Sequence, residues 1–233
     1  MKSIIRLVIT LTISFLLILS CTDSTEPNET AKIHGIVTNS IGQPVSNAKI
    51  MLTYYTESIP VRPETPISFN LTDSTYIKLW ITTHDLSDTM KVIIDDYLTP
   101  SFYSFTWDAT DSNGQVMVSN YYDWHLKIGY NQVDDKLLLN MIYNNITGDE
   151  VNNYESFATT DDNGHYEFEI NRLSFSVADN EMEVKDINGV AIDTIRVSRI
   201  VKIWALNTDY DPVFIDSVFV NEDSVTEGNL SFD

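Results

Sequence analysis

Two short loops carry the residues that come nearest to a metal site in this sequence. Each mixes acidic and amide side chains and ends in glycine: Asp108, Asp111 and Asn113 precede Gly114, and Asp161, Asp162 and Asn163 precede Gly164. Calcium loops offer oxygen ligands in this way. Neither loop has the further acidic residue at the spacing that an EF-hand needs. Tight β-turns favour the same residue types, so we interpret both loops as structural turns, with weak calcium binding as the alternative.

The other polar residues form no recognisable catalytic pattern. The four histidines stand singly, without a His-x-x-x-His pair, at His34, His84, His125 and His165. We expect His125, which lies between Trp124 and Leu126, on the outer face of a strand. Nucleophile elbows, phosphate loops and dinucleotide fingerprints are missing from the sequence. Acidic pairs such as Asp95-Asp96 fit a solvated face in so acidic a chain. We therefore predict that the protein is not an enzyme and needs no cofactor.

Aromatic residues could instead bind a ligand by stacking. The chain has four tryptophans and twelve tyrosines, and exposed rings of this kind can stack on sugars. Tyr121 and Trp124 are the candidate ligand-binding aromatics, in a cluster with Tyr122. Burial in a core or between domains is the favoured alternative, and we expect it for Trp107.

Charge and cysteine content limit the partners. The formal net charge is −20 at pH 7, and it would fall to −22 if Lys2 and Arg6 were removed with a signal peptide. A protein with this much negative charge repels nucleic acid and anionic lipid. Neither is therefore expected as a ligand. Cys21 is the only cysteine; no disulfide can brace the fold, and hydrophobic cores must hold it.

The first twenty residues predict export. Basic residues precede an apolar run from Leu7 to Leu19, which ends at Ser20-Cys21. This is the pattern of a secretory signal peptide and is short for a membrane span, which needs about 20 residues. Ile18-Leu19-Ser20-Cys21 resembles the bacterial lipobox. That resemblance implies removal of a signal helix at 1–20 and lipid on Cys21; an ordinary signal peptide with an incidental cysteine is the alternative.

A flexible tether and a location at the outer membrane are predicted together with the lipobox. Residues 22–30 contain no apolar side chain that could be buried, so 21–31 is expected to be a flexible tether. Two or three acyl chains anchor a protein stably where one does not. We expect a lipid-anchored protein of the outer membrane, on its periplasmic or its cell-surface face.

Alternating apolar residues predict that the body is all β. Ile50, Leu52 and Tyr54 fall on one face of a strand, and Tyr166 and Phe168 alternate with glutamates. Further strands are expected at Ile33 to Thr38, Tyr76 to Thr82, Lys91 to Ile94, Lys136 to Leu139, Val201 to Leu206 and Val213 to Val220. Met182 to Val197 reads as a hairpin that turns at Asn188-Gly189.

The first two strands carry a more specific pattern. Gly35-x-Val37-x(4)-Gly42-x-Pro44-Val45-x-x-Ala48 resembles the first hairpin of carboxypeptidase regulatory-like domains, and Thr160 to Phe168 resembles a later strand of the same family. The resemblance implies a transthyretin-like β-sandwich made from residues 32–57 and 152–233, without catalytic residues.

The interval 58–151 resembles a second family. Its matching positions are Trp107, Asp108, Asp111, Gly114, Ser119, Tyr122 and Leu126. They resemble the immunoglobulin-like domains of flagellar hook-capping proteins and the related sorting domains of type nine secretion. Ala109 and Asn120 replace two glycines of that pattern, and Ala109 suggests a slightly different corner. The resemblance implies an immunoglobulin-like sandwich inserted in the first; two sandwiches in series, divided near Glu57, are the alternative.

These observations give one functional hypothesis and one alternative. The hypothesis is a lipid-anchored, non-catalytic lipoprotein that serves as a structural or protein-binding module at the cell envelope. The alternative is a surface lipoprotein that binds carbohydrate.

Overall fold

The computed structural model describes residues 31–56, 67–84, 86–170, 173, 181–185, 190–221 and 224–233. Throughout these residues the regular structure is β-strand, apart from one short 3-10 helix, η1 (Gly148–Asn153). The expected all-β fold is therefore confirmed. Cys21, the signal segment and the Asn188-Gly189 turn lie outside the described residues. Within the described part of the chain no helix is long and apolar enough to span a membrane.

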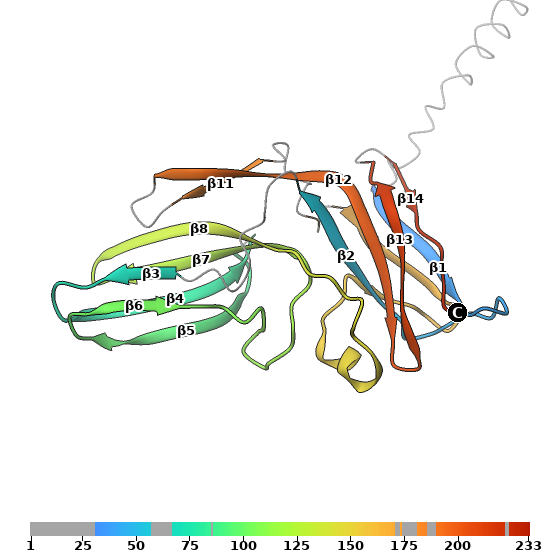
Figure 1. Ribbon diagram of the computed structural model, residues 1–233, viewed down its shortest axis with the longest axis horizontal. Coiled ribbons are helices and arrows are strands. Elements are labelled where there is room, and N and C mark those ends of the chain that lie inside the picture. The colour runs from blue at the N-terminus through green and yellow to red at the C-terminus, as the bar shows by residue number, and fades with distance from the viewer. Residues whose placement is uncertain are drawn as a thin grey trace, which may run out of the picture.

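The first body consists of two facing sheets (Figure 1). One sheet holds the short strands β1 (Lys32–Thr38), β10 (His165–Glu169), β14 (Thr226–Glu227) and β15 (Leu230–Ser231). The other holds β2 (Lys49–Thr56), β9 (Ala158–Thr159), β11 (Glu181–Lys185), β12 (Ala191–Asn207) and β13 (Tyr210–Phe219). Apolar side chains of both sheets meet in one core, to which Ile33, Leu52 and Ile203 belong, all fully buried. Between the sheets, the rings of Phe157 and Phe168 stack with their centroids 5.3 Å apart.

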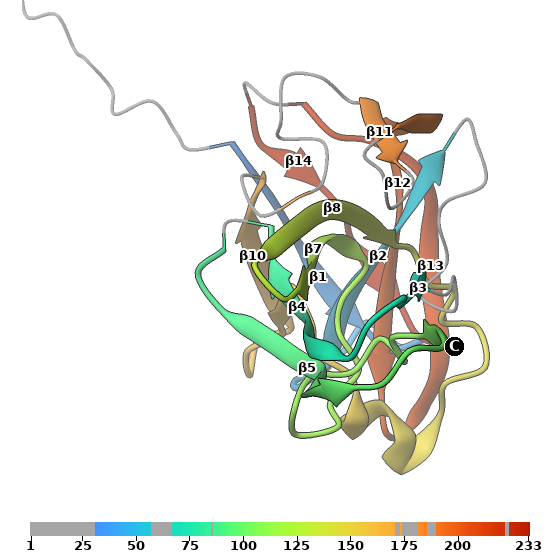
Figure 2. The same ribbon diagram turned by 90° about the vertical axis from the view of Figure 1, so that its left-hand side faces the viewer.

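The second body contains the strands between β2 and η1. A four-stranded antiparallel sheet is formed by β4 (Thr75–Thr83), β5 (Thr89–Leu98), β7 (Asn120–Ile128) and β8 (Asn131–Leu139), and a two-stranded sheet by β3 (Ile67–Asn70) and β6 (Phe102–Phe105). Figure 2, in which this body faces the viewer, shows β8, β7, β4 and β5 following one another across the larger sheet. Ile77, Leu79 and Phe69 lie in the core between the two sheets. Trp107 is 2% exposed, as expected.

Strand pairing joins stretches of the chain on either side of the second body. β1 pairs with β10, and β2 pairs with both β9 and β12, so the strand at Lys49–Thr56 has partners that follow β8 in the sequence. β2 and β10 belong to opposite sheets of one body and contribute to one core.

Several strands differ in extent from expectation. β8 begins at Asn131 rather than near Lys136, because its first half is polar and shows no apolar alternation. β12 runs without a break through the two strands expected at either side of residue 198, with an irregular register between Val197 and Val201. Ala109 has φ 60°, a left-handed conformation that favours glycine, so this corner keeps a glycine-like backbone.

Candidate functional site

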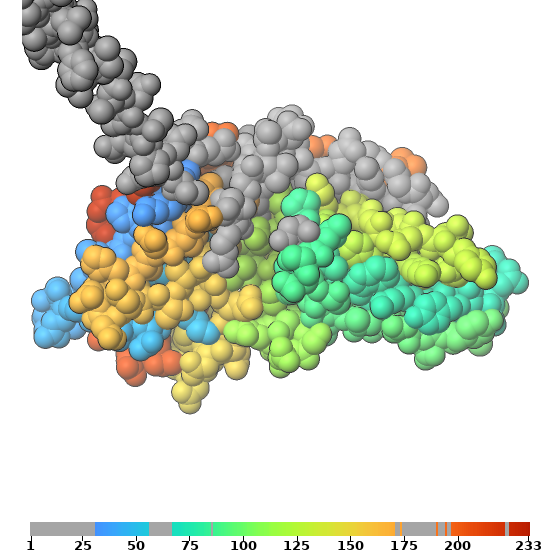
Figure 3. All heavy atoms as spheres, turned by 180° about the vertical axis from the view of Figure 1, so that it is seen from behind, coloured from blue at the N-terminus to red at the C-terminus, as the bar shows by residue number. Residues whose placement is uncertain are grey.

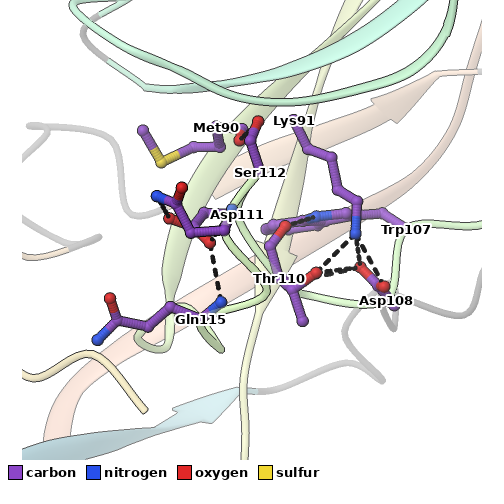
Figure 4. A network of polar contacts seen from close by, with 9 residues as sticks. Met90, Lys91, Trp107, Asp108, Thr110, Asp111, Ser112 and Gln115 are labelled. Carbon is purple, nitrogen blue, oxygen red and sulfur yellow. Dashed lines mark hydrogen bonds and ion pairs between the residues drawn. The ribbon is translucent and has the colours of Figure 1, made fainter. Parts of the chain in front are cut away.

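The two candidate calcium loops are closed turns in which an aspartate binds backbone N–H groups; Figure 4 shows the first of them. One oxygen of Asp111 accepts the backbone N–H of Asn113 and that of Gln115, both at 2.8 Å. Asp161 accepts the corresponding N–H groups of Asn163 at 2.8 Å and His165 at 2.9 Å. These bonds, chiefly those from Gln115 and His165, hold the pKa of each aspartate below its ordinary value.

The same turn occurs a third time without an acidic residue. Asn39 accepts the backbone N–H groups of Ile41 and Gln43 through its side-chain oxygen, at 3.2 and 2.9 Å. Each of the three turns closes with a glycine of positive φ: 77° at Gly42, 85° at Gly114 and 74° at Gly164. Because an asparagine serves as well as an aspartate, the carboxylates are explained by turn geometry.

Asp108 is also engaged. The ammonium group of Lys91 lies 2.7 and 2.9 Å from its two carboxylate oxygens, and the Thr110 hydroxyl donates to it at 2.7 Å (Figure 4). Among the described residues no three histidine, cysteine, aspartate or glutamate side chains are grouped closely enough to hold a metal ion. The residues grouped as calcium candidates in the sequence are thus divided between three local networks.

The predicted ligand-binding aromatics do not form an exposed patch. Tyr121 is 7% exposed and belongs to the core of the first body, and Tyr122 is 3% exposed in the core of the second. Trp124 is partly buried between the two apolar clusters of the second body. The structure thus agrees with the favoured alternative, burial, for Tyr121 and Tyr122, because β7 is a central strand and side chains on both of its faces are covered.

A different surface gathers polar and aromatic side chains in order. Strand alternation and register place a series of side chains on one face of the β5-β4-β7-β8 sheet, and we call twelve of them the polar face. It comprises Tyr76, Lys78, Trp80 and Thr82 of β4, Asp95 and Tyr97 of β5, Asp123, His125 and Lys127 of β7, and Gln132, Asp134 and Lys136 of β8. The opposite face carries Ile77, Leu79 and Ile81, which are fully buried. The polar face is thus the complement of the apolar pattern that predicted the strand.

The polar face is buried at one end and open at the other. Thr82, Asp123 and His125 are 5 to 8% exposed, whereas Tyr76 is 40% and Tyr97 64% exposed. His125 was expected on the outer face of a strand; it lies on the polar face and is covered there. The backbone of β11 lies close to β8, above the second body in Figure 1.

The buried end is a satisfied hydrogen-bond network. Nδ1 of His125 lies 2.6 Å from Asp134, and its Nε2 lies 2.9 Å from the hydroxyl of Thr82. The neighbouring His84 contacts Asp123 at 3.1 Å. Burial raises the pKa of Asp123, and His84 opposes this shift.

Carboxylate, imidazole and hydroxyl follow one another here as in a nucleophilic triad. Thr82 is nevertheless only 5% exposed, and the indole of Trp80 stacks on the His125 ring with centroids 4.9 Å apart. A substrate carbonyl cannot reach the Thr82 oxygen in this arrangement. The network therefore orders the face rather than activating a nucleophile.

The open end is organised by a second network. Asp95 accepts a hydrogen bond from the Tyr76 hydroxyl and pairs with Lys78 at 3.5 Å. The Lys78 ammonium lies 5.4 Å from the centre of the Trp80 ring. The bond from Tyr76 lowers the pKa of Asp95, and the same bond raises that of Tyr76.

The first body repeats this arrangement on β2, β12 and β13. The Tyr55 hydroxyl donates to Asp216, which lies 3.7 Å from the ammonium group of Lys202. Lys202 in turn lies 4.2 Å from the centre of the Phe214 ring. The two tyrosine–aspartate–lysine groups are chemically alike and lie on different bodies, so each is a natural control for the other.

A buried hydrogen-bond chain joins the two bodies; we call it the junction network. Tyr143 is fully buried, and its hydroxyl lies 2.9 Å from the hydroxyl of Ser119, which accepts the backbone N–H of Met141 at 2.9 Å. The Thr53 hydroxyl of β2 donates to the Met141 carbonyl at 2.5 Å and accepts the indole N–H of Trp204 at 2.9 Å. Burial raises the pKa of Tyr143 to about 12.

An amide side chain and an apolar contact reinforce the junction. Asn140 accepts the backbone N–H of Tyr54 and donates to its carbonyl, both at 2.9 Å, in the manner of a strand residue. Tyr143 meets the Trp204 ring edge-on at 6.0 Å. Figure 3 shows the two bodies abutting on the face in view. Sequence patterns missed these residues because the network joins β2 and β12 to segments outside the strands, at positions far from them along the chain.

Comparison with known proteins identifies no relative: no protein-family model and no curated protein matches this chain.

Proposed function

We propose that the protein is an exported, lipid-anchored lipoprotein whose two β bodies act as a non-catalytic structural or binding module at the cell envelope. The junction network is the observation that supports a module of this kind. It ties β2 and β12 of the first body to the segment that leaves β8 of the second, through buried or part-buried polar groups that satisfy one another. Such a connection holds a binding surface in a fixed orientation.

The anchor rests on the sequence around Cys21. The basic start, the apolar run and Ser20-Cys21 support lipidation of this cysteine and location at the outer membrane, on either face. The likeness to carboxypeptidase regulatory-like domains and to hook-capping or sorting domains stays a prediction. It favours an exported protein without catalytic residues. It also favours envelope proteins or glycans as the partners of that protein.

The anchor is tested by replacing the cysteine. Cells that produce the wild-type chain or Cys21→Ala are labelled with radioactive palmitate and separated into soluble and membrane fractions. The wild type is expected in the membrane fraction with label, and Cys21→Ala in the soluble fraction without label. A Cys21→Ala chain that stays with membranes after a high-salt wash would refute the lipid anchor.

Protease accessibility determines separately on which face of the outer membrane the protein lies. Added protease should degrade the wild-type chain on intact cells if the body is on the cell surface, and only after the outer membrane is permeabilised if it is periplasmic. A periplasmic protein of the same cells serves as the control for intact envelopes.

A further inference from the structure

We propose that the open end of the polar face binds a neutral polysaccharide chain. This inference names a ligand for the binding module proposed above, and therefore rests on that role. The site comprises Tyr76, Lys78 and Trp80 of β4, Asp95 and Tyr97 of β5, and Gln132 and Asp134 of β8.

The aromatic part of the site is a cross-strand tyrosine pair. Tyr76 and Tyr97 are register partners in β4 and β5 and are 40% and 64% exposed. The Cβ atoms of directly paired positions on one face lie about 5 Å apart, so both rings project from the same region of the sheet. The Tyr97 hydroxyl donates to the Ser74 carbonyl at 3.0 Å, which fixes the ring. Tyrosine combines an apolar ring with a polar end, and its ring can pack against the C–H face of a sugar.

Hydrogen-bonding groups flank this surface in fixed positions. Asp95 lies between the Tyr76 hydroxyl and the Lys78 ammonium. Asp134 accepts the side-chain amide of Gln132 at 2.8 Å and also contacts His125. Because these side chains already hold one another, little rotamer freedom remains to be lost when a ligand binds.

The chemistry of the face selects the ligand class. Carboxylates only accept hydrogen bonds and ammonium groups only donate them, whereas each sugar hydroxyl does both and can satisfy either neighbour. An apolar protein surface would bury Asp95 and Lys78 away from water without replacing their partners, which is costly. Anionic polymers are repelled by a chain whose formal net charge is −20. A neutral chain of hydroxylated rings meets all three conditions.

The experiment is affinity gel electrophoresis of the full chain in native gels. The gels contain soluble xylan, mannan, mixed-linkage β-glucan or dextran, or the anionic polygalacturonate for comparison. At least one neutral polymer should retard the wild type. The variant Tyr97→Ala should weaken that retardation at least fivefold, which corresponds to the loss of roughly 1 kcal/mol. The control variant Tyr55→Ala, which removes an exposed tyrosine of the first body, should leave retardation unchanged.

Three results would overturn the proposal: no retardation by any neutral polymer, retardation by polygalacturonate alone, or equal retardation of wild type and Tyr97→Ala. Urea unfolding of Tyr97→Ala separates loss of binding from loss of folding, and the exposed position predicts a nearly unchanged midpoint. None of these gel or unfolding results affects the membrane fractionation of Cys21→Ala. Failure of the glycan site and failure of the lipid anchor are therefore distinguishable.

Discussion

Thr53 is the residue at which the junction network can be broken with least change of shape. Its hydroxyl serves both bodies, since it donates to the Met141 carbonyl at 2.5 Å and accepts from the Trp204 indole at 2.9 Å. Thr53→Val replaces that hydroxyl by a methyl group of similar size. The change therefore leaves packing nearly intact and removes both hydrogen bonds.

The expected cost follows from the groups left behind. Trp204 is 2% exposed and its bond to Thr53 is part-buried, so its N–H has little access to water once its acceptor is gone. One unsatisfied buried polar group costs about 1 to 3 kcal/mol, and the Met141 carbonyl loses a donor as well. We expect Thr53→Val to lower the free energy of unfolding by roughly 2 to 4 kcal/mol. For a chain of this size that corresponds to a fall in Tm of roughly 4 to 16 °C.

Urea unfolding followed by tryptophan fluorescence measures the change, with calorimetry as a second probe. Thr89→Val is the matched control, because Thr89 lies exposed in β5; its effect should stay within about 0.5 kcal/mol. A loss smaller than about 1 kcal/mol for Thr53→Val would show that the hydroxyl does not couple the bodies, and the rigid module would lose its main support.

Two further changes test the packing and the turns. Gly35→Ala should destabilise the first body by about 1 to 3 kcal/mol or more, because a Cβ there would lie 2.2 Å from the Gly228 carbonyl oxygen; a melting temperature equal to that of the wild type would contradict this close approach. The pKa of Asp161 is lowered in the folded state, so its stabilising effect is complete above the ordinary value of 3.8 and is lost as the pH falls through the lower folded pKa. Asp161→Asn should therefore flatten the dependence of unfolding free energy on pH in this acid range, and unfolding titrations as steep as those of the wild type would argue against the turn.

Local sequence patterns predicted most strands because burial on one face imposes a period of two. Ile77, Leu79 and Ile81 identified β4, and Tyr166 and Phe168 identified β10, and the structure buries these side chains. β8 was recognised only where its apolar residues begin. Its first half contains one apolar residue, Val133, among polar ones, so hydrophobicity carries no alternating signal there.

Alternation states which residues share a face but not what covers that face. Asp123 and His125 belong to the polar face, and the tertiary arrangement decides that they are buried. The same limit hid the junction, because Thr53 and Met141 are 88 positions apart. Conversely, the Tyr76–Lys78–Trp80 series was present in the sequence as the complement of the apolar residues of β4.

The pairing of β1 with β10 has a consequence for assembly. Lys32 of β1 reaches Glu167 of β10 across 135 positions, whereas β4, β5, β7 and β8 find their partners within a short stretch. Closing so long a loop is entropically costly and slow. The second body can therefore fold before β1 and β10 of the first body have paired. Until the residues from β9 onward emerge, β1 and β2 have unpaired edges and are exposed to misassociation. A protein with this topology therefore depends on protection from intermolecular association during translation more than its modest size suggests.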